Sequence, residues 1–195
     1  MNHWKVQKYD NPWPYIIIDN FFDDEVWGYI QNKIIANKKE YIEQYRKHVD
    51  THIGGYLFKA IPDQTLKNFF DKNLTIDFIK NNFKRHRGFT EIYSKVDIKC
   101  HYKPKAHRIH DEMPQKVVST SVYVDPTHNV GTVIFDKDKN FHGVITWKPN
   151  RALVFTAESG VTWHSFGNWE NSMRITIDHF IQRIDSDFSL PDWQD

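Results

Sequence analysis

At 195 residues, the chain has the length of one domain with a sizeable core. Hydrophobic residues make up 39%, charged residues 26%, and the formal net charge is +1, which argues against binding a polyanion through overall charge. Cys100 is the only cysteine, so no intrachain disulfide can form. The polar N-terminus has no signal-peptide core and no apolar run is long enough to span a membrane, so we expect a cytoplasmic protein.

The first 88 residues indicate one strand followed by helices. The apolar run Trp13–Ile18 is rich in β-branched residues and predicts a buried strand. Acidic capping residues and apolar residues at helical spacing predict three helices, which begin near Glu25, at Asp63 and at Ile76. A short apolar segment, Tyr56–Phe58, lies between the first two helices.

From Thr90 onward the periodicity changes to that of strands. The expected strands are Ile92–Tyr102, Val117–Val124, Val130–Phe135, Val144–Trp147, Ala152–Thr156, Val161–Ser165 and Arg174–Gln182. Short strands preceded by helices predict a mainly β sandwich or jelly roll with the helices packed on one face. Residues 185–195 are acidic and are expected to form a loose tail. No linker or repeat is visible, so 1–195 is expected to be a single domain, with helical support over 1–88 and the β core over 89–184.

Two histidines and a carboxylate form a candidate metal site. His110-Asp111-Glu112 is followed about fifty residues later by His164. Two imidazoles and one carboxylate on one face of a metal are the ligand set of non-haem Fe(II) oxygenases. Alternate side chains of a strand share a face, which favours Glu112 over Asp111, while His107 competes with His110. The other histidines have no partner at ligand spacing and are expected at surface or packing positions: His3, His48, His52, His86, His101, His128, His142 and His179.

Arg174 lies ten positions after His164, at the start of the last expected strand. In that strand Arg174, Thr176 and Asp178 share one face. A guanidinium can hold a carboxylate through two parallel hydrogen bonds, and Thr176 can add a hydroxyl donor. The alternative is a surface arginine that pairs with Glu170 or Asp178 and contributes little.

These motifs together resemble the Fe(II)/2-oxoglutarate-dependent oxygenase superfamily, in the style of its small prolyl-hydroxylase-like members from bacteria and bacteriophages. The resemblance runs from Trp13 to Phe180. It rests on motifs that occur in the same order: Trp13-Pro14-Tyr15 through Phe22, His110-x-Glu112, Val122-Tyr123-Val124, Gly131-Thr132, Asn150–Phe155, His164 and Arg174. It implies a double-stranded β-helix with helices packed on the larger sheet. Most members carry Asp where this chain has Glu112, whose extra methylene moves the carboxylate outward.

The resemblance implies a dioxygenase, most simply a hydroxylase, that converts 2-oxoglutarate and O2 to succinate and CO2. His110, Glu112 and His164 would hold Fe(II). Arg174 would hold the distal carboxylate of 2-oxoglutarate, with Thr176 and Tyr123 also at the co-substrate site, and ascorbate is a further possible cofactor. Lys116 would lie near the pocket mouth, although a solvated lysine is the simpler interpretation.

The primary substrate stays open at this stage. A prolyl or other peptide side chain is the first hypothesis. Basic residues before the proposed site, Lys103, Lys105 and Arg108 among them, would suit a nucleotide or another small anion. A jelly-roll module that binds a metal without turnover is the rival from another class, because fold does not entail function. A cupin-like isomerase or a sugar-binding protein with a different divalent metal is a third reading.

Overall fold

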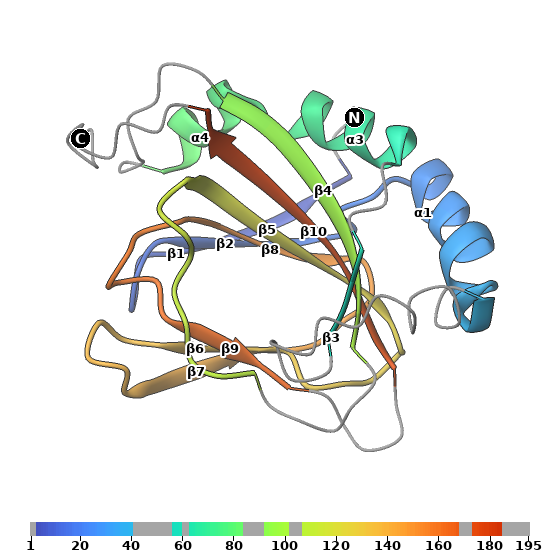
Figure 1. The fold of residues 1–195 in the computed structure, drawn as a ribbon. Coiled ribbons are helices and arrows are strands. Elements are labelled where there is room, and N and C mark those ends of the chain that lie inside the picture. The colour runs from blue at the N-terminus through green and yellow to red at the C-terminus, as the bar shows by residue number, and fades with distance from the viewer. Residues whose placement is uncertain are drawn as a thin grey trace.

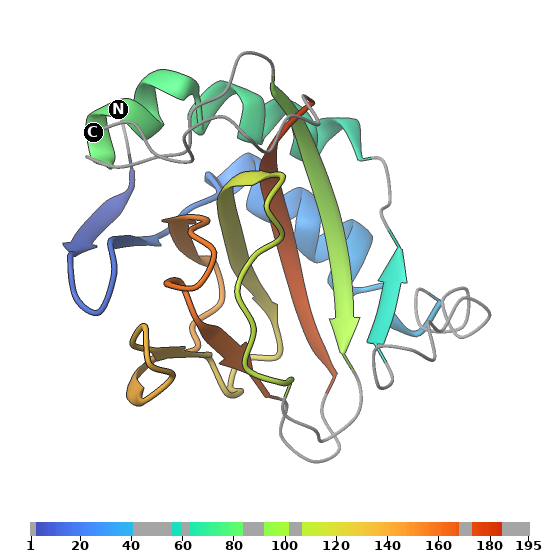
Figure 2. The same cartoon turned by 60° about the vertical axis from the view of Figure 1, so that its left-hand side comes forward.

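The computed structural model describes residues 3–40, 63–83, 92–101, 107–167 and 173–184, together with the backbone of 56–59. Two antiparallel sheets face each other, and the helices lie against the outer face of the larger sheet (Figure 1). The view in Figure 2 shows the same three layers from another side. The predicted acidic tail, 185–195, lies outside the described residues.

The larger sheet contains seven strands in the order β1-β2-β8-β5-β10-β4-β3. Their bounds are β1 (Lys5–Tyr9), β2 (Tyr15–Asp19), β3 (Tyr56–Lys59), β4 (Ile92–His101), β5 (Lys116–Asp125), β8 (Arg151–Thr156) and β10 (Arg174–Arg183). The long central strands β4, β5 and β10 pair antiparallel along most of their length. The prediction of a mainly β fold with N-terminal helices is confirmed.

The smaller sheet has the order β7-β6-β9. Its strands are β6 (Thr132–Phe135), β7 (Phe141–Ile145) and β9 (His164–Phe166). The segment from His107 to His110 runs along the free side of β9. The amide of His107 donates to Phe166 O over 2.7 Å, and His110 and His164 exchange backbone hydrogen bonds of 3.0 and 2.9 Å. This pairing brings His110 beside His164.

The described helices are short and capped at their N-termini by side chains. They are α1 (Asp24–Ile30), which continues into the π-helical turn η1 (Gln31–Ile35), α3 (Gln64–Asn73) and α4 (Ile76–Asn82). Asp23, Asp63 and Thr75 each accept a hydrogen bond from an amide in the first helical turn, as expected for N-caps. None of these helices has the length and apolar character needed to cross a membrane.

Two apolar layers hold the fold together, one on each face of the large sheet, as the residues of β10 illustrate. Ile175 and Ile177 belong to the layer between the large sheet and the helices. In the same layer His179 stacks on Phe70 of α3, with ring centroids 4.5 Å apart. The opposite face of β10 looks toward the smaller sheet, where a second apolar layer surrounds Trp147. The alternation predicted for this strand is therefore observed.

Several boundaries differ from the prediction. β1 was not predicted, because it is an edge strand whose five residues are all exposed and show no apolar alternation. β7 begins at Phe141 and ends at Ile145, whereas Val144–Trp147 was expected. β9 begins at His164, not at Val161, because the chain before it turns and both the amide and the hydroxyl of Thr162 donate to Glu158 O over 3.0 Å.

Gly131 sits where two segments of the smaller sheet approach closely. A Cβ at this position would lie 1.6 Å from the backbone oxygen of Ile145, so only glycine fits without moving the chain.

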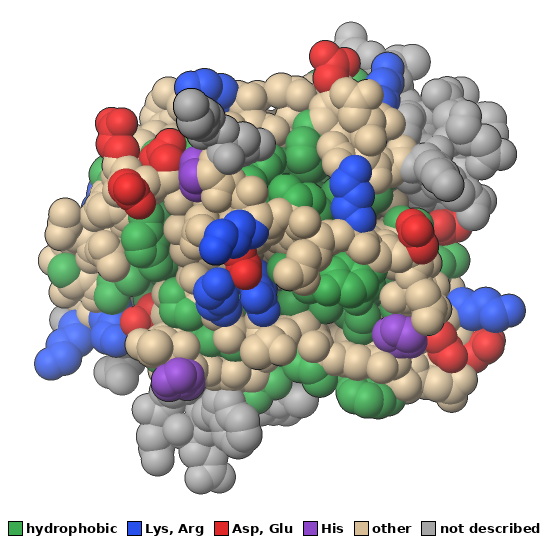
Figure 3. All heavy atoms as spheres, turned by 180° about the vertical axis from the view of Figure 1, so that it is seen from behind, with side chains coloured by type: hydrophobic (Ala, Val, Ile, Leu, Met, Phe, Trp, Pro, Cys, Tyr) green, Lys and Arg blue, Asp and Glu red, His purple; other side chains and the backbone are tan. Residues whose placement is uncertain are grey.

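On the back of the molecule, acidic and basic side chains are interspersed among apolar patches (Figure 3). Among the described residues on that face, the Lys and Arg side chains do not form a continuous stripe.

Candidate active site

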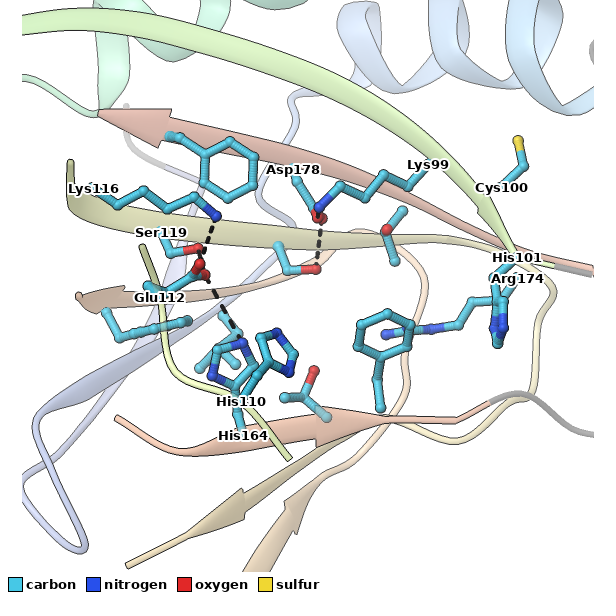
Figure 4. A pocket seen from close by; sticks show the side chains of 17 residues that line it. Lys99, Cys100, His101, His110, Glu112, Lys116, Ser119, His164, Arg174 and Asp178 are labelled. Atoms are coloured by element: carbon cyan, nitrogen blue, oxygen red, sulfur yellow. Dashed lines mark hydrogen bonds and ion pairs between the residues drawn. The ribbon is translucent and has the colours of Figure 1, made fainter. Parts of the chain in front are cut away.

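A cavity of about 80 Å³ lies on the inner face of the large sheet. A cavity that holds one buried water needs about 10–15 Å³, so this cavity has room for several groups of that size. Its walls come mainly from β4, β5, β8 and β10 of the large sheet and from β6 and β9 of the small one. Figure 4 shows Glu112, His110 and His164 at one end of the cavity, Arg174 and His101 at the other, and the Lys99–Asp178 pair between them.

His110 and His164 face each other at the first end. Their ring centroids are 4.3 Å apart. Nδ1 of His110 lies 3.0 Å from Arg108 O, and Nδ1 of His164 lies 2.9 Å from Thr162 O. A carbonyl oxygen only accepts, so each Nδ1 carries a proton, and Nε2 is the ring nitrogen that can offer a lone pair. Burial, together with the neighbouring His164, lowers the pKa of His110 to about 3, which keeps this ring neutral at ordinary pH.

Glu112 lies between these histidines and β5. Its side chain is buried, and its Oε1 is 3.9 Å from Nε2 of His164. Ser119 Oγ donates to Oε1 over 2.6 Å, and the Lys116 ammonium donates to Oε2 over 2.5 Å. Burial is the largest single effect and by itself would raise the pKa of Glu112. The charge of Lys116, the neighbouring His164 and the hydrogen bonds from Lys116 and Ser119 together outweigh burial and lower the pKa to about 2. Glu112 is therefore an ionised carboxylate inside the protein.

Asp111 takes no part in this cluster. Its carboxylate accepts hydrogen bonds from the Gly160 amide at 2.7 Å and from Ser159 Oγ at 3.1 Å. The expectation that the segment is a strand is wrong: only His110 forms a bridge, and the three residues after it have no regular structure. The irregular backbone, rather than strand alternation, turns Glu112 inward and leaves Asp111 at the 159–160 turn.

His107, the competitor of His110, lies beside the cluster and does not line the cavity. Its ring packs between His110, at 4.3 Å, and Phe166, at 4.9 Å. Within the described residues, no three His, Cys, Asp or Glu side chains are arranged to hold a metal ion as they stand. His110, Glu112 and His164 therefore have the donor atoms that a metal site needs, but these atoms are not yet arranged as a coordination shell.

Arg174 occupies the other end of the cavity. It is only 3% exposed, which excludes the alternative of a surface arginine. Its Cζ lies 4.4 Å from the ring centre of Phe166, 5.1 Å from that of Trp147 and 5.8 Å from that of Tyr123. Three aromatic rings around a guanidinium fix its orientation and shield it from water. The guanidinium points along the cavity toward Glu112 (Figure 4).

Thr176 and Tyr123 have different positions relative to this end. Thr176 lines the cavity next to Arg174 on β10. Tyr123 is buried behind the lining: its hydroxyl donates to Thr132 Oγ1 over 2.8 Å and accepts from the Thr132 amide over 3.0 Å. Its ring stacks on Trp147 at 4.6 Å. Thr132 faces the cavity in its place.

Other cavity residues were missed or underrated by sequence reasoning. Asp178 accepts from Lys99 at 2.6 Å and from Ser121 at 2.9 Å. His101 was expected at a surface or packing position, yet it is buried in the cavity wall, where burial and the Arg174 charge lower its pKa to about 4. The register of β4 against β10 places Lys99 opposite Thr176 and His101 opposite Arg174. Only that register, which the sequence does not display, could have identified them.

No family profile and no curated protein matches the sequence. Solved structures do match. A prolyl-4-hydroxylase from Pseudomonas putida aligns over 88% of this chain and 93% of its own, with TM-score 0.63 and 12% identity. The viral collagen prolyl hydroxylase from Paramecium bursaria Chlorella virus 1, in its 2-oxoglutarate complex, aligns over 88% and 96%, with TM-score 0.58 and 15% identity.

A Burkholderia pseudomallei oxidoreductase of the 2-oxoglutarate–Fe(II) oxygenase family aligns over 87% of this chain and 84% of its own, with TM-score 0.57 and 11% identity. The chain therefore has the double-stranded β-helix fold shared by prolyl hydroxylases and 2-oxoglutarate–Fe(II) oxygenases. The resemblance inferred from the motifs is confirmed at the level of the fold.

Proposed function

We propose that the protein is an Fe(II)- and 2-oxoglutarate-dependent dioxygenase. One observation carries the proposal: a single cavity has His110, Glu112 and His164 at one end and the buried Arg174 at the other. The first group matches the two-histidine, one-carboxylate set of non-haem Fe(II) oxygenases. The second suits a carboxylate held at a distance from the metal.

The metal would be held by Nε2 of both histidines and by one oxygen of Glu112. The two Nδ1–H groups donate to backbone carbonyls, which fixes the tautomers and ring orientations that such ligation needs. Iron with 2-oxoglutarate and O2 would supply the oxidising chemistry, while the protein supplies binding and orientation. Because Glu112 and the neutral His110 already have the protonation states of ligands, no proton has to leave these two groups.

Arg174 would bind the distal carboxylate of 2-oxoglutarate, with Thr176 adding a hydroxyl donor. Both side chains are buried in the lining, so the carboxylate would exchange water for these donors. In the present arrangement Tyr123 would act indirectly, because its hydroxyl holds Thr132, a residue of the cavity wall. The aromatic rings around Arg174 would keep water from the clamp.

The test is Fe(II) binding under anaerobic conditions, followed by succinate formation with 2-oxoglutarate, O2 and ascorbate. The unmodified protein should bind one Fe(II) and release succinate. His164→Ala should lose Fe(II) binding, because it removes one of the two Nε2 donors. Wild-type Fe(II) affinity in His164→Ala would show that this end of the cavity is not the metal site.

The rival is a jelly-roll module of the same fold that binds without turnover. One observation favours it: the three candidate ligands do not form a closed set among the described residues. The two readings differ in succinate formation. Fe(II) binding that never leads to consumption of 2-oxoglutarate would support the module.

For the primary substrate we propose a peptide side chain, with proline as the first to test, since two of the three solved structures described above are prolyl hydroxylases. A nucleotide is the alternative, favoured by the basic run before His110, of which residues 102–106 lie outside the described residues. Succinate release should be followed with proline-containing peptides and with single-stranded DNA over a range of salt concentrations. Turnover stimulated by DNA alone and lost as salt rises would refute the peptide reading.

A further inference from the structure

Glu112 is held from both sides by residues that no metal chemistry requires. Ser119 Oγ donates to Oε1 over 2.6 Å and Lys116 Nζ to Oε2 over 2.5 Å. The two oxygens differ in their surroundings. Oε1 looks toward Nε2 of His164, 3.9 Å away, whereas Oε2 is turned to the lysine. One oxygen is thus directed at the histidines and the other is held away from them.

Lys116 is itself fixed in place. Its side chain is 12% exposed, and Nζ lies 3.7 Å from the centre of the Phe180 ring. Its position at the start of β5 is set by the sheet, where Lys116 pairs with Gln182 of β10. An ammonium held by a buried carboxylate and an aromatic face has few other positions to adopt.

A second lysine in the same cavity provides an internal comparison. Lys99 Nζ lies 2.6 Å from Asp178 and 4.9 Å from the centre of the same Phe180 ring. Both pairs therefore join a lysine to a carboxylate of the cavity lining beside Phe180. They differ in that only the partner of Lys116 stands next to His110 and His164.

We propose that Lys116 is a positioning residue of the metal site: its ammonium holds Oε2 of Glu112 so that Oε1 alone is presented beside His164. The inference rests on the proposed function. A glutamate has one more rotatable bond than an aspartate, so its carboxylate needs an additional anchor to reach the same precision. Lys116 and Ser119 supply that anchor, and the longer side chain then acts as a one-oxygen ligand. Partners of this kind that orient a ligating group typically contribute about 10–100-fold to metal affinity.

The test compares Lys116→Met with Lys99→Met by anaerobic Fe(II) titration, followed by tryptophan fluorescence or calorimetry. Methionine keeps an apolar chain over the Phe180 ring and removes the ammonium. Lys116→Met should raise the Fe(II) dissociation constant about 10–100-fold. Lys99→Met should change it by less than about threefold, because Asp178 is not beside the histidines. Lys116→Arg, which keeps a cationic donor at the position, should retain most of the affinity.

The opposite result has a clear physical meaning. If Lys116 only repelled the metal as a neighbouring cation, Lys116→Met would bind Fe(II) more tightly. Equal or tighter binding by Lys116→Met, with an intact thermal unfolding transition, would overturn the positioning role. If Lys116→Met does not fold, Ser119→Ala is the variant to test, because it removes the other anchor of Glu112 without changing any charge. An unchanged Fe(II) affinity in Ser119→Ala would then overturn the inference.

Failure of this inference can be told apart from failure of the proposed function. An unmodified protein that binds no Fe(II) would refute both. An unmodified protein that binds Fe(II) and forms succinate, with the same Fe(II) affinity in Lys116→Met, would refute only the role of Lys116.

Discussion

Replacing Arg174 by alanine tests the co-substrate end of the cavity most directly. The guanidinium is 3% exposed and three aromatic rings lie within 5.8 Å of its Cζ. A carboxylate that enters such an environment loses its water and depends on the arginine for compensation. Leaving a buried charge without its partner costs about 2–5 kcal/mol, which corresponds to a roughly 30-fold to several thousand-fold weaker 2-oxoglutarate affinity. We therefore expect the KM for 2-oxoglutarate to rise by at least about 30-fold in Arg174→Ala.

The assay is succinate release as a function of 2-oxoglutarate concentration, with Fe(II) affinity measured separately. Fe(II) binding should stay close to wild type, because Arg174 lies at the opposite end of the cavity from His164 (Figure 4). Arg174→Lys should recover only part of the affinity, since an ammonium cannot form two parallel hydrogen bonds. Arg151→Ala is a matched control: Arg151 pairs with Asp19 at 2.7 Å and does not line the cavity.

An unchanged KM in Arg174→Ala would refute this reasoning. The co-substrate carboxylate would then bind elsewhere, and the other cations of the lining, Lys99 and Lys116, would be the next residues to replace. A parallel loss of Fe(II) affinity would have a different meaning, namely that the substitution had collapsed the cavity as a whole.

Two further predictions concern a ligand and a buried histidine. Glu112→Ala should abolish Fe(II) binding. Asp111→Ala should keep the Fe(II) dissociation constant within about tenfold of wild type, because Asp111 only supports the 159–160 turn. Fe(II) titration of both variants checks this order of damage, and the reverse order would make Asp111 the ligand. Burial lowers the pKa of His179 to about 3, so between about pH 6.5 and 3 the unfolded state binds the extra proton and stability falls as the pH falls. His179→Phe should reduce this slope by up to about 1.4 kcal/mol per pH unit in denaturant titrations, and an unchanged slope would contradict the assignment.

Local patterns in the sequence were sufficient for the supporting elements. Leu66, Phe69 and Phe70 have helical spacing, and all three are buried in the layer between α3 and the large sheet. The alternation of β10 correctly placed Arg174 and Thr176 on one face. These features could be predicted because a helix or a strand imposes its period on the burial of its own residues.

The contents of the cavity depended on information that no local pattern carries. Lys99 and His101 enter the cavity because β4 pairs with β10 in one particular register. A shift of one residue would have turned both side chains toward the helices. Glu112 illustrates a different limit. It faces His164 as predicted, but it does so from an irregular segment, whereas the prediction assumed a β-strand.

The charges of the cavity lining bear on whether one site could hold both a dication and a dicarboxylate, as the proposed function requires. The lining contains three cations, Lys99, Lys116 and Arg174, and two carboxylates, Glu112 and Asp178, so with neutral histidines its formal charge is +1. Fe(II) alone would raise this charge by two, and doubly ionised 2-oxoglutarate alone would lower it by two. In a cavity largely removed from water such imbalances are costly, whereas the two together leave the charge unchanged. Glu112 pairs with Lys116 and Asp178 pairs with Lys99, so each carboxylate of the lining has a lysine counter-ion before either ligand enters. The proposed function would add the metal beside His110 and His164 and the distal carboxylate of 2-oxoglutarate beside Arg174.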